Sequence, residues 1–469
     1  MRKGFLVVSA ALILISLLAA GLISGVISDE AGYFSWLQES ITTGLVLSIM
    51  EYIDAYFAQI YATLVPDNPS LFVDVMVALL VVFVIKTSLF LYLSLSHYRK
   101  RSQVAVGNAE LSVSIIVPCF NEEKVVANCV HGLMKQDYGN YKILLVNDGS
   151  TDGTERVCKE LVSQYPQKVE YIYKKNGGKA SALRLGLEQS SGEIIVTMDA
   201  DSIFLPDTLK NLVSSFDDPK VDAVGGNVRV ANKDCFLGRN QAVEYLTGLA
   251  IQKRSFAYLN CMQVIAGAIG AFRREVLVKV GGYSSDTIVE DMDLTVSILK
   301  AGYRVEYNGK AIAYTEAPAN LRDFLKQRYR WTFGGFQVLR KHWSMLFNRK
   351  YGHAGMIGLP YLLIAPWIDV VFTLLFTITF VGAAVHGALA RFFLFYSFMM
   401  FVQGALVLYA IKIDGEERRL LLSSCTYGLW YNQILSLVTL FAGYGFLSGA
   451  SASWNKVVRL GKNVLVEEK

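Results

Sequence analysis

The chain has 469 residues, of which 53% are hydrophobic, and its mean hydropathy is +0.36. These values are too high for an ordinary soluble protein and indicate a membrane protein. Basic residues beside the apolar runs account for the net charge of +5. Nothing in the sequence resembles a nucleic-acid-binding module, so no nucleic acid is predicted as a partner.

The N-terminal region, residues 1–98, contains two apolar runs that are long enough to cross a bilayer as helices. They cover residues 5–27 and 71–95, and a crossing takes about 20 residues. The first run is long for a signal peptide and no clear A-x-A site follows it, which favours an anchor.

A third segment lies between these runs, at residues 41–65. Its Glu51 and Asp54 favour an interfacial amphipathic helix over a further crossing. Basic flanks at residues 1–3 and 97–101 place both ends of the hairpin in the cytoplasm, together with the domain that follows.

The C-terminal region, residues 366–450, contains three further apolar runs, at residues 367–385, 392–413 and 427–447. Three crossings would place the basic tail, residues 451–469, outside the cell, which contradicts the charge rule. Either residues 356–367 form a partial or re-entrant crossing, or the last run does not cross simply. The sequence therefore predicts a multi-pass protein of the cell membrane whose number of C-terminal crossings stays open.

The six cysteines form no C-x-x-C pair and mostly fall in the predicted cytoplasmic part, which indicates reduced core thiols. The five histidines lack metal-ligand spacing, so a zinc site has little support.

The central region, residues 99–320, alternates short apolar runs with helix-compatible stretches. Four runs are continuously apolar, which suits parallel strands covered by helices on both faces: residues 112–117, 142–146, 169–174 and 193–198. This pattern predicts an α/β domain with a mostly parallel sheet. Ligands collect at the carboxyl ends of such strands, where this sequence places PCFNEE, NDGSTDGT, KNGGK and DADS.

Each of these polar motifs is weak when taken alone. NDGSTDGT is also typical of a plain turn followed by a helix cap. NGGKAS lacks the spacing of a Walker-type phosphate loop, although Lys179 at a helix start suits a phosphate. Asp199 and Asp201 are able to cap the next turn, but two adjacent carboxylates repel each other unless a cation lies between them. Their arrangement suits Mg²⁺ or Mn²⁺ held by carboxylates and substrate phosphates.

The motifs PCFNEE, NDGSTDGT, DAD, VEDMDL and QRYRW, in this order and between membrane segments, resemble those of the processive membrane glycosyltransferases of family 2. That group includes cellulose, chitin, hyaluronan and poly-N-acetylglucosamine synthases, and the last of these is the most similar. The resemblance covers residues 113–343. It implies a nucleotide-sugar-binding domain of the GT-A type, flanked by transmembrane helices and by interfacial helices at residues 321–365.

The resemblance also implies roles for individual residues. Asp291 would be the general base beside Glu290, and Asp201 would bind the metal together with Asp199. The donor would be bound by Phe120, Glu122, Asp148, Lys179, Asp199, Gln327 and Arg330, and the acceptor by Trp331, Gly267 and Gly270. The chain departs from the family pattern at Val289, where many relatives have Thr.

Two of these assignments have simpler alternatives. EDMD is also a favourable acidic helix start, and QRYRW is also a plausible interfacial anchor. The small residues around Gly267 and Gly270 suit either passage of a sugar chain or tight packing.

The predicted activity is metal-dependent inverting transfer of a sugar, N-acetylglucosamine, from a UDP-sugar to the non-reducing end of a β-linked polysaccharide acceptor. An alternative is transfer of a single sugar to a polyprenyl phosphate, and a non-enzymatic alternative is a transporter or receptor with a degenerate domain. The need for a small accessory membrane subunit or a homo-oligomer stays open.

Overall fold

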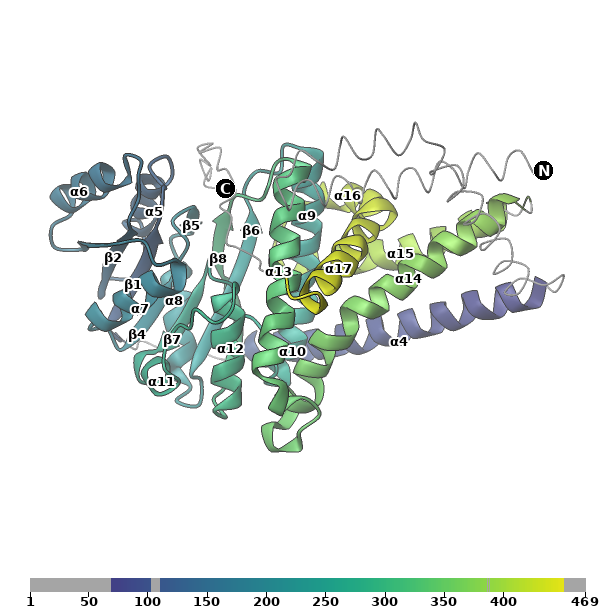
Figure 1. Ribbon diagram of the computed structural model, residues 1–469, viewed down its shortest axis with the longest axis horizontal. Coiled ribbons are helices and arrows are strands. Elements are labelled where there is room, and N and C mark those ends of the chain that lie inside the picture. Colours follow the sequence, from purple (N-terminus) through teal and green to yellow (C-terminus); the bar gives the residue numbers. More distant parts are fainter. Residues whose placement is uncertain (1–68, 103–109, 386, 388, 451–469) are drawn as a thin grey trace.

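The computed structural model describes residues 69–102, 110–385, 387 and 389–450. The predicted anchor at residues 5–27, the interfacial segment at 41–65 and the basic tail lie outside these residues. An α/β domain occupies one side of the molecule and long helices the other, with helix α13 (Leu321–Lys341) between them (Figure 1).

One half of the central sheet is parallel. It consists of β1 (Val113–Cys119), β2 (Tyr141–Asp148), β3 (Val169–Lys174) and β4 (Ile194–Thr197), in the order β3-β2-β1-β4. β1 and β4 are almost entirely buried because helices cover both faces of the sheet. The four predicted strands are therefore confirmed.

The other half of the sheet was not predicted from the sequence. It consists of β5 (Ser202–Phe204), β6 (Ala223–Val230), β7 (Gly270–Arg273) and β8 (Val305–Thr315). The short β7 runs antiparallel to both β4 and β6, and β5 runs antiparallel to β8, while β6 and β8 are parallel. The complete sheet of eight strands is thus mixed, with the order β3-β2-β1-β4-β7-β6-β8-β5.

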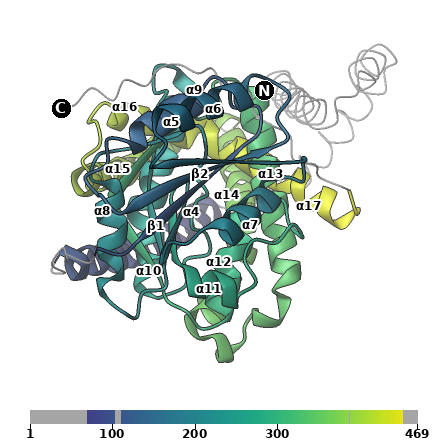
Figure 2. The same cartoon turned by 90° about the vertical axis from the view of Figure 1, so that its left-hand side faces the viewer.

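Helices cover the sheet where their small and apolar residues allow close contact. α7 (Lys179–Gln189) packs on β1 and β2 through Ala182 and Leu183, and a side chain at Gly186 would lie 2.4 Å from Ile116. The helices near the sheet are seen together in Figure 2. The others of the domain are α5 (Val126–Leu133), α6 (Thr154–Gln164), α8 (Thr208–Val213), α9 (Phe236–Thr247), α10 (Arg254–Tyr258), α11 (Arg274–Lys279) and α12 (Glu290–Lys300).

Helix α4 (Pro69–Ser102) is fixed to the sheet through a buried contact at its C-terminal end. His97 Nε2 lies 2.5 Å from Glu306 Oε1 on β8. Burial raises the pKa of Glu306, but the His97 ring and the Tyr307 N–H outweigh burial and lower that pKa to about 2. A charged carboxylate therefore joins the helix to the domain.

Among the described residues, one helix is long and apolar enough to cross a membrane, Ala354–Val385. It comprises a π-helical start (Ala354–Gly358) and α14 (Leu359–Val385), with Pro366 inside. Residues 356–367, for which a partial or re-entrant crossing was one prediction, instead continue into this helix.

The other predicted C-terminal runs are also helical, although their crossing of the membrane stays a prediction. They form α15 (Leu389–Asp414), then α16 (Leu420–Thr426), and lastly a π-helical turn (Tyr427–Tyr431) that leads into α17 (Asn432–Leu447). All six cysteines are free, and four of them are buried.

Candidate active site

The polar segments after β1 and β2 are tied to each other at one edge of the sheet. Ser150 Oγ accepts a hydrogen bond from the Asn121 N–H at 2.9 Å, and Asn121 Oδ1 accepts one from the Thr151 N–H at 2.8 Å. Thr154 Oγ1 accepts from the Glu122 N–H at 2.7 Å. These bonds fix the backbone beside Phe120 and Glu122, both of which stay partly exposed.

Asp148, the last residue of β2, connects the polar segment after β2 to the glycine-containing segment after β3. Its two carboxylate oxygens accept hydrogen bonds from the N–H groups of Gly177 and Gly178, at 2.9 and 2.8 Å. Lys174 Nζ lies 2.5 Å from the same carboxylate. Sequence reasoning missed Lys174, although Asp148 and Lys174 are paired in the strand register and each ends its strand.

Lys179 links the polar segment that follows β3 to the one that follows β4, through its contact with Asp199. It is the first residue of α7, and Gly178 before it has a φ of +85°, which favours glycine. Lys179 Nζ lies 2.6 Å from Asp199 and 2.9 Å from Glu290. Burial would lower the pKa of Lys179, but the surrounding carboxylates raise it well above its usual value. The structure therefore brings a firmly cationic amine to the centre of the acidic residues.

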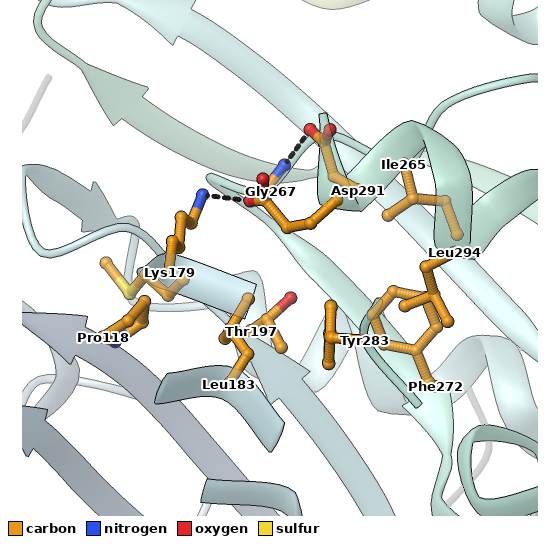
Figure 3. Close-up of a pocket in the computed structure, with 12 residues that line it drawn as sticks. Pro118, Lys179, Leu183, Thr197, Ile265, Gly267, Phe272, Tyr283, Asp291 and Leu294 are labelled. Atoms are coloured by element: carbon orange, nitrogen blue, oxygen red, sulfur yellow. Dashed lines mark hydrogen bonds and ion pairs between the residues drawn. The ribbon is translucent and has the colours of Figure 1, made fainter. Parts of the chain in front are cut away.

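Asp291 faces the same space from the first turn of α12, beside Gly267 (Figure 3). Its oxygens accept hydrogen bonds from the N–H groups of Gly267, at 3.1 Å, and Met292, at 2.8 Å. Burial and the neighbouring Glu290 raise the pKa of Asp291, while Lys179 and the two N–H groups oppose that rise. A carboxylate with a raised pKa is suited to accept a proton.

The two predicted acceptor glycines have different surroundings. A side chain at Gly267 would lie 2.7 Å from Lys179 Nζ, so the absence of one keeps the space between Lys179 and Asp291 open. Gly270 lies inside β7, where a side chain would meet Ile265 at 2.7 Å. The structure thus gives Gly270 a packing role, the alternative considered for these small residues.

Asp201 lies at the start of β5, where the hydroxyl groups of Ser202 and Thr315 donate to its Oδ1, each at 3.3 Å. No group of three or more His, Cys, Asp or Glu suited to a metal occurs among the described residues. Asp199 and Asp201 supply carboxylate oxygens, the kind of ligand that Mg²⁺ and Mn²⁺ take one or two at a time while substrate phosphates and water complete the shell.

The QRYRW motif lies on α13. Gln327 is buried, and Arg330 makes no hydrogen bond or ion pair within the described part of the chain. Trp331 is partly exposed and lies one helical turn before Gly334. A side chain at Gly334 would lie 2.6 Å from Val289, the residue before Glu290. The helix that carries Trp331 therefore packs directly on the start of α12.

Sequence reasoning missed three contacts that hold α12 and the segment just before it against α13 and its C-terminal end. Gln337 Oε1 accepts a hydrogen bond from the Ile288 N–H at 3.0 Å. The buried carboxylate of Asp293 lies 2.8 Å from both Lys341 Nζ and His342 Nε2. No local signal pointed to these pairs, because the partners are 48 or 49 residues apart. They fix the helix that presents Asp291.

The fold and this site define the class of the protein. Residues 114–281 match the sequence profile described as "Glycosyl transferase family 2". The central domain is therefore a family 2 glycosyltransferase domain, which confirms the family predicted from the motifs.

Particular relatives share more of the chain. It is 30% identical over 257 residues to the poly-beta-1,6-N-acetyl-D-glucosamine synthase of Staphylococcus aureus (strain COL), covering 54% of this chain and 61% of that protein. It is 31% identical over 240 residues to the synthase of that name from Staphylococcus epidermidis, covering 51% of this chain and 58% of that protein. The match thus spans less than two thirds of either relative.

A solved structure shares the fold. A mannosyltransferase from Pyrobaculum calidifontis, in complex with GDP-Man and Mn²⁺, is 21% identical, with a TM-score of 0.54. The match covers 78% of this chain and 99% of that one. This likeness confirms the GT-A fold.

Proposed function

We propose that this protein is a membrane-embedded, metal-dependent synthase. It transfers N-acetylglucosamine from a UDP-sugar to the non-reducing end of a growing β-linked polysaccharide. The family 2 domain and the similarity to the staphylococcal synthases support this reaction class. The observation that carries the proposal is the position of Asp291, a partly exposed carboxylate of raised pKa that faces the Lys179 cation across an opening kept clear by Gly267.

The donor lies along the edge where the four strand-end segments meet. Phe120, Glu122 and Asp148 border the nucleoside, in a frame that backbone hydrogen bonds fix before binding. Lys179 and Arg330 face the diphosphate, on which negative charge develops as the sugar leaves. Gln327, buried behind Arg330 on α13, supports that side of the donor.

Asp199 and Asp201 would hold the metal ion at the diphosphate. There the ion would supply positive charge that stabilises the leaving group. Because Lys179 contacts Asp199 at 2.6 Å, the fixed cation and the metal site share a carboxylate.

Asp291 accepts the proton of the attacking hydroxyl group. The hydroxyl oxygen forms a bond to the anomeric carbon of the donor while the bond from that carbon to the diphosphate oxygen breaks, and UDP leaves with the electron pair. A single displacement inverts the anomeric centre, so an α-linked donor gives a β linkage. Glu290 beside Asp291 keeps Lys179 in place, at 2.9 Å from its Nζ.

Trp331 provides a flat apolar surface for the terminal sugar of the acceptor, on the helix that packs against the start of α12. The apolar helix Ala354–Val385 follows on the same side of the domain, which supports a site at the surface of the bilayer and export of the product through the membrane. The catalytic domain then lies in the cytoplasm.

The test uses the full chain, purified in detergent, with a panel of UDP-sugars and Mn²⁺ or Mg²⁺, followed by mass analysis of the products. We expect release of UDP from UDP-N-acetylglucosamine and a ladder of β-linked oligomers. Incorporation of a single sugar into a polyprenyl phosphate would replace the proposal with a lipid-linked transferase. No release of nucleoside diphosphate from any donor would overturn it.

A further inference from the structure

A cluster of three polar side chains, of which Arg328 and Tyr431 are buried and Glu244 partly exposed, lies beside Trp331. Its members come from three separate elements: Arg328 from α13, Glu244 from α9, and Tyr431 from the π-helical turn before α17. The Arg328 side chain is 4% exposed. An arginine this deeply buried needs partners for its charge and its donors.

The three side chains are bonded to one another, and Arg328 also donates to Gln327 Oε1 at 3.2 Å. One guanidinium nitrogen of Arg328 donates to Glu244 Oε2 and also to the Tyr431 hydroxyl, the latter at 3.0 Å. The Tyr431 hydroxyl in turn donates to Glu244 Oε2 at 2.6 Å. Burial would lower the pKa of Arg328, but Glu244 and Tyr431 raise it, so the guanidinium stays charged. Because each pair is bonded, the direction of the guanidinium plane is fixed.

That guanidinium lies over the Trp331 ring, 4.3 Å from the ring centre. The same group also lies 5.0 Å from the ring centre of Phe324 and 5.9 Å from that of Tyr245. A cation over an indole attracts the ring and restricts its rotation. Trp331 is partly exposed, so the guanidinium holds one face of the indole while other parts of the ring stay accessible.

We propose that Arg328 is a positioning residue, held by Glu244 and Tyr431, which fixes the Trp331 indole in the orientation that the terminal sugar of the acceptor requires. This inference rests on the proposed function, since it assigns Trp331 to the acceptor. It extends that function because Tyr431 belongs to the C-terminal helices. The acceptor platform is therefore built jointly by the glycosyltransferase domain and the helical region that follows it.

The test is Tyr431→Phe, which removes one hydroxyl group and keeps the ring. Tyr427→Phe is the matched control, because the two rings stack at 4.9 Å in the same turn and the Tyr427 hydroxyl makes no hydrogen bond within the described residues. Initial rates are measured against a soluble β-linked N-acetylglucosamine oligosaccharide and, separately, against UDP-N-acetylglucosamine. We expect the KM for the oligosaccharide to rise about 10-fold in Tyr431→Phe, the scale of a lost hydrogen bond to a charged group. The KM for the UDP-sugar stays within about twofold of wild type, because among the described residues the Tyr431 hydroxyl is bonded to Arg328 and Glu244 and to no residue assigned to the donor.

A double-mutant cycle separates positioning from a merely structural role. In a Trp331→Ala background, Tyr431→Phe no longer changes the KM for the oligosaccharide, because the ring that it orients is absent. Arg328→Lys keeps the charge but loses the planar group, so we expect the KM for the oligosaccharide to rise as in Tyr431→Phe. The comparison of donor with acceptor is made on Tyr431→Phe alone, because Arg328 also donates to Gln327.

Three outcomes count against the proposals in different ways. An unchanged KM for the oligosaccharide in both Tyr431→Phe and Arg328→Lys overturns the positioning role. Equal losses for donor and acceptor, or full additivity with Trp331→Ala, assign the cluster to folding alone and overturn it as well. A wild-type chain that transfers no sugar overturns the proposed function instead.

Discussion

Two charged side chains on opposite sides of the proposed site, Asp148 on the donor side and Arg328 on the acceptor side, are held in different ways. Asp148 is bonded by the N–H groups of Gly177 and Gly178. Arg328 is bonded instead by Glu244 and Tyr431, which are 84 and 103 residues away. The position of Asp148 therefore depends on the backbone conformation of a loop, and that of Arg328 on a matched charge and a hydroxyl group from distant helices.

Removal of the metal should have the largest effect, because it takes away the counter-charge of the donor diphosphate. We expect EDTA to abolish transfer and added Mn²⁺ or Mg²⁺ to restore it. Asp201→Asn should lose most turnover while its thermal unfolding matches that of wild type. Undiminished transfer in excess chelator would contradict a metal at Asp199 and Asp201.

The substitution Asp291→Asn should have the second-largest effect on transfer. We expect transfer to be slower by at least about 10²-fold, the usual scale for a positioned base. Binding of UDP-sugar, measured by calorimetry, should change little, because the residues proposed to bind the donor are unchanged. Equal losses of binding and turnover would make Asp291 a structural carboxylate.

The pH dependence of the wild type gives a second measurement on Asp291. Burial raises the pKa of this carboxyl above the ordinary value of 3.8, and only its ionised form accepts a proton. We therefore expect kcat/KM to fall on the acid side through a pKa above 3.8, and Asp291→Asn should lose this limb. An acid limb that survives the substitution would belong to another group.

The substitution Asp293→Asn tests whether the buried carboxylate of Asp293 holds α12 in place, and the measured quantity is the stability of the protein. The substitution removes the charge that Lys341 and His342 contact, and breaking a buried charge pair costs about 3 to 5 kcal/mol. Asp286→Asn is the control, because Asp286 contacts the same Lys341 at 2.8 Å but its side chain is 67% exposed. Thermal unfolding of the two variants should differ clearly, and equal stabilities would show that the contact does not hold α12.

Gly149→Ala probes the donor side and should have the smallest effect of the four substitutions. Gly149 has a φ of +71°, and a side chain there would lie 2.7 Å from the Asn176 N atom. We expect a loss of about 1 to 3 kcal/mol in stability and a raised KM for the UDP-sugar, with the KM for the acceptor unchanged. Gly139→Ala, at a position with no atom within 4 Å, should match wild type in both measurements.

The same contrast also explains what the sequence could predict. The parallel strands are continuous apolar runs that end in polar segments, so β1 to β4 and most of the residues proposed to bind the donor could be recognised from the local sequence. β5 and β7 have three and four residues, too few for a periodic pattern, and β6 contains the buried Arg229. Strand pairing in that half of the sheet depends on partners far along the chain.

Single residues whose role depends on partners far along the chain were also not recognised from the sequence. The Q-x-x-R-W spacing drew attention to Arg330 and passed over Arg328, whose role depends on partners that the fold alone brings together. The sequence offers no reason to treat Gly267 and Gly270 differently. The structure distinguishes them, because Gly267 borders the opening beside Asp291 whereas Gly270, the first residue of β7, packs against Ile265.

If the helix Ala354–Val385 crosses a membrane as proposed, its length bears on where the domain lies relative to the lipid. Its 32 residues span about 48 Å at 1.5 Å each, whereas the hydrocarbon core is about 30 Å thick. An upright crossing would use about 20 residues and leave about 12 outside. The first turns are seated on the domain, where Leu359 is buried and the Gln263 side chain donates to the Gly358 carbonyl group at 3.0 Å. In the proposed membrane protein, the helix would then set the height of the domain above the lipid surface, so an added or deleted turn would change the distance between Asp291 and the bilayer.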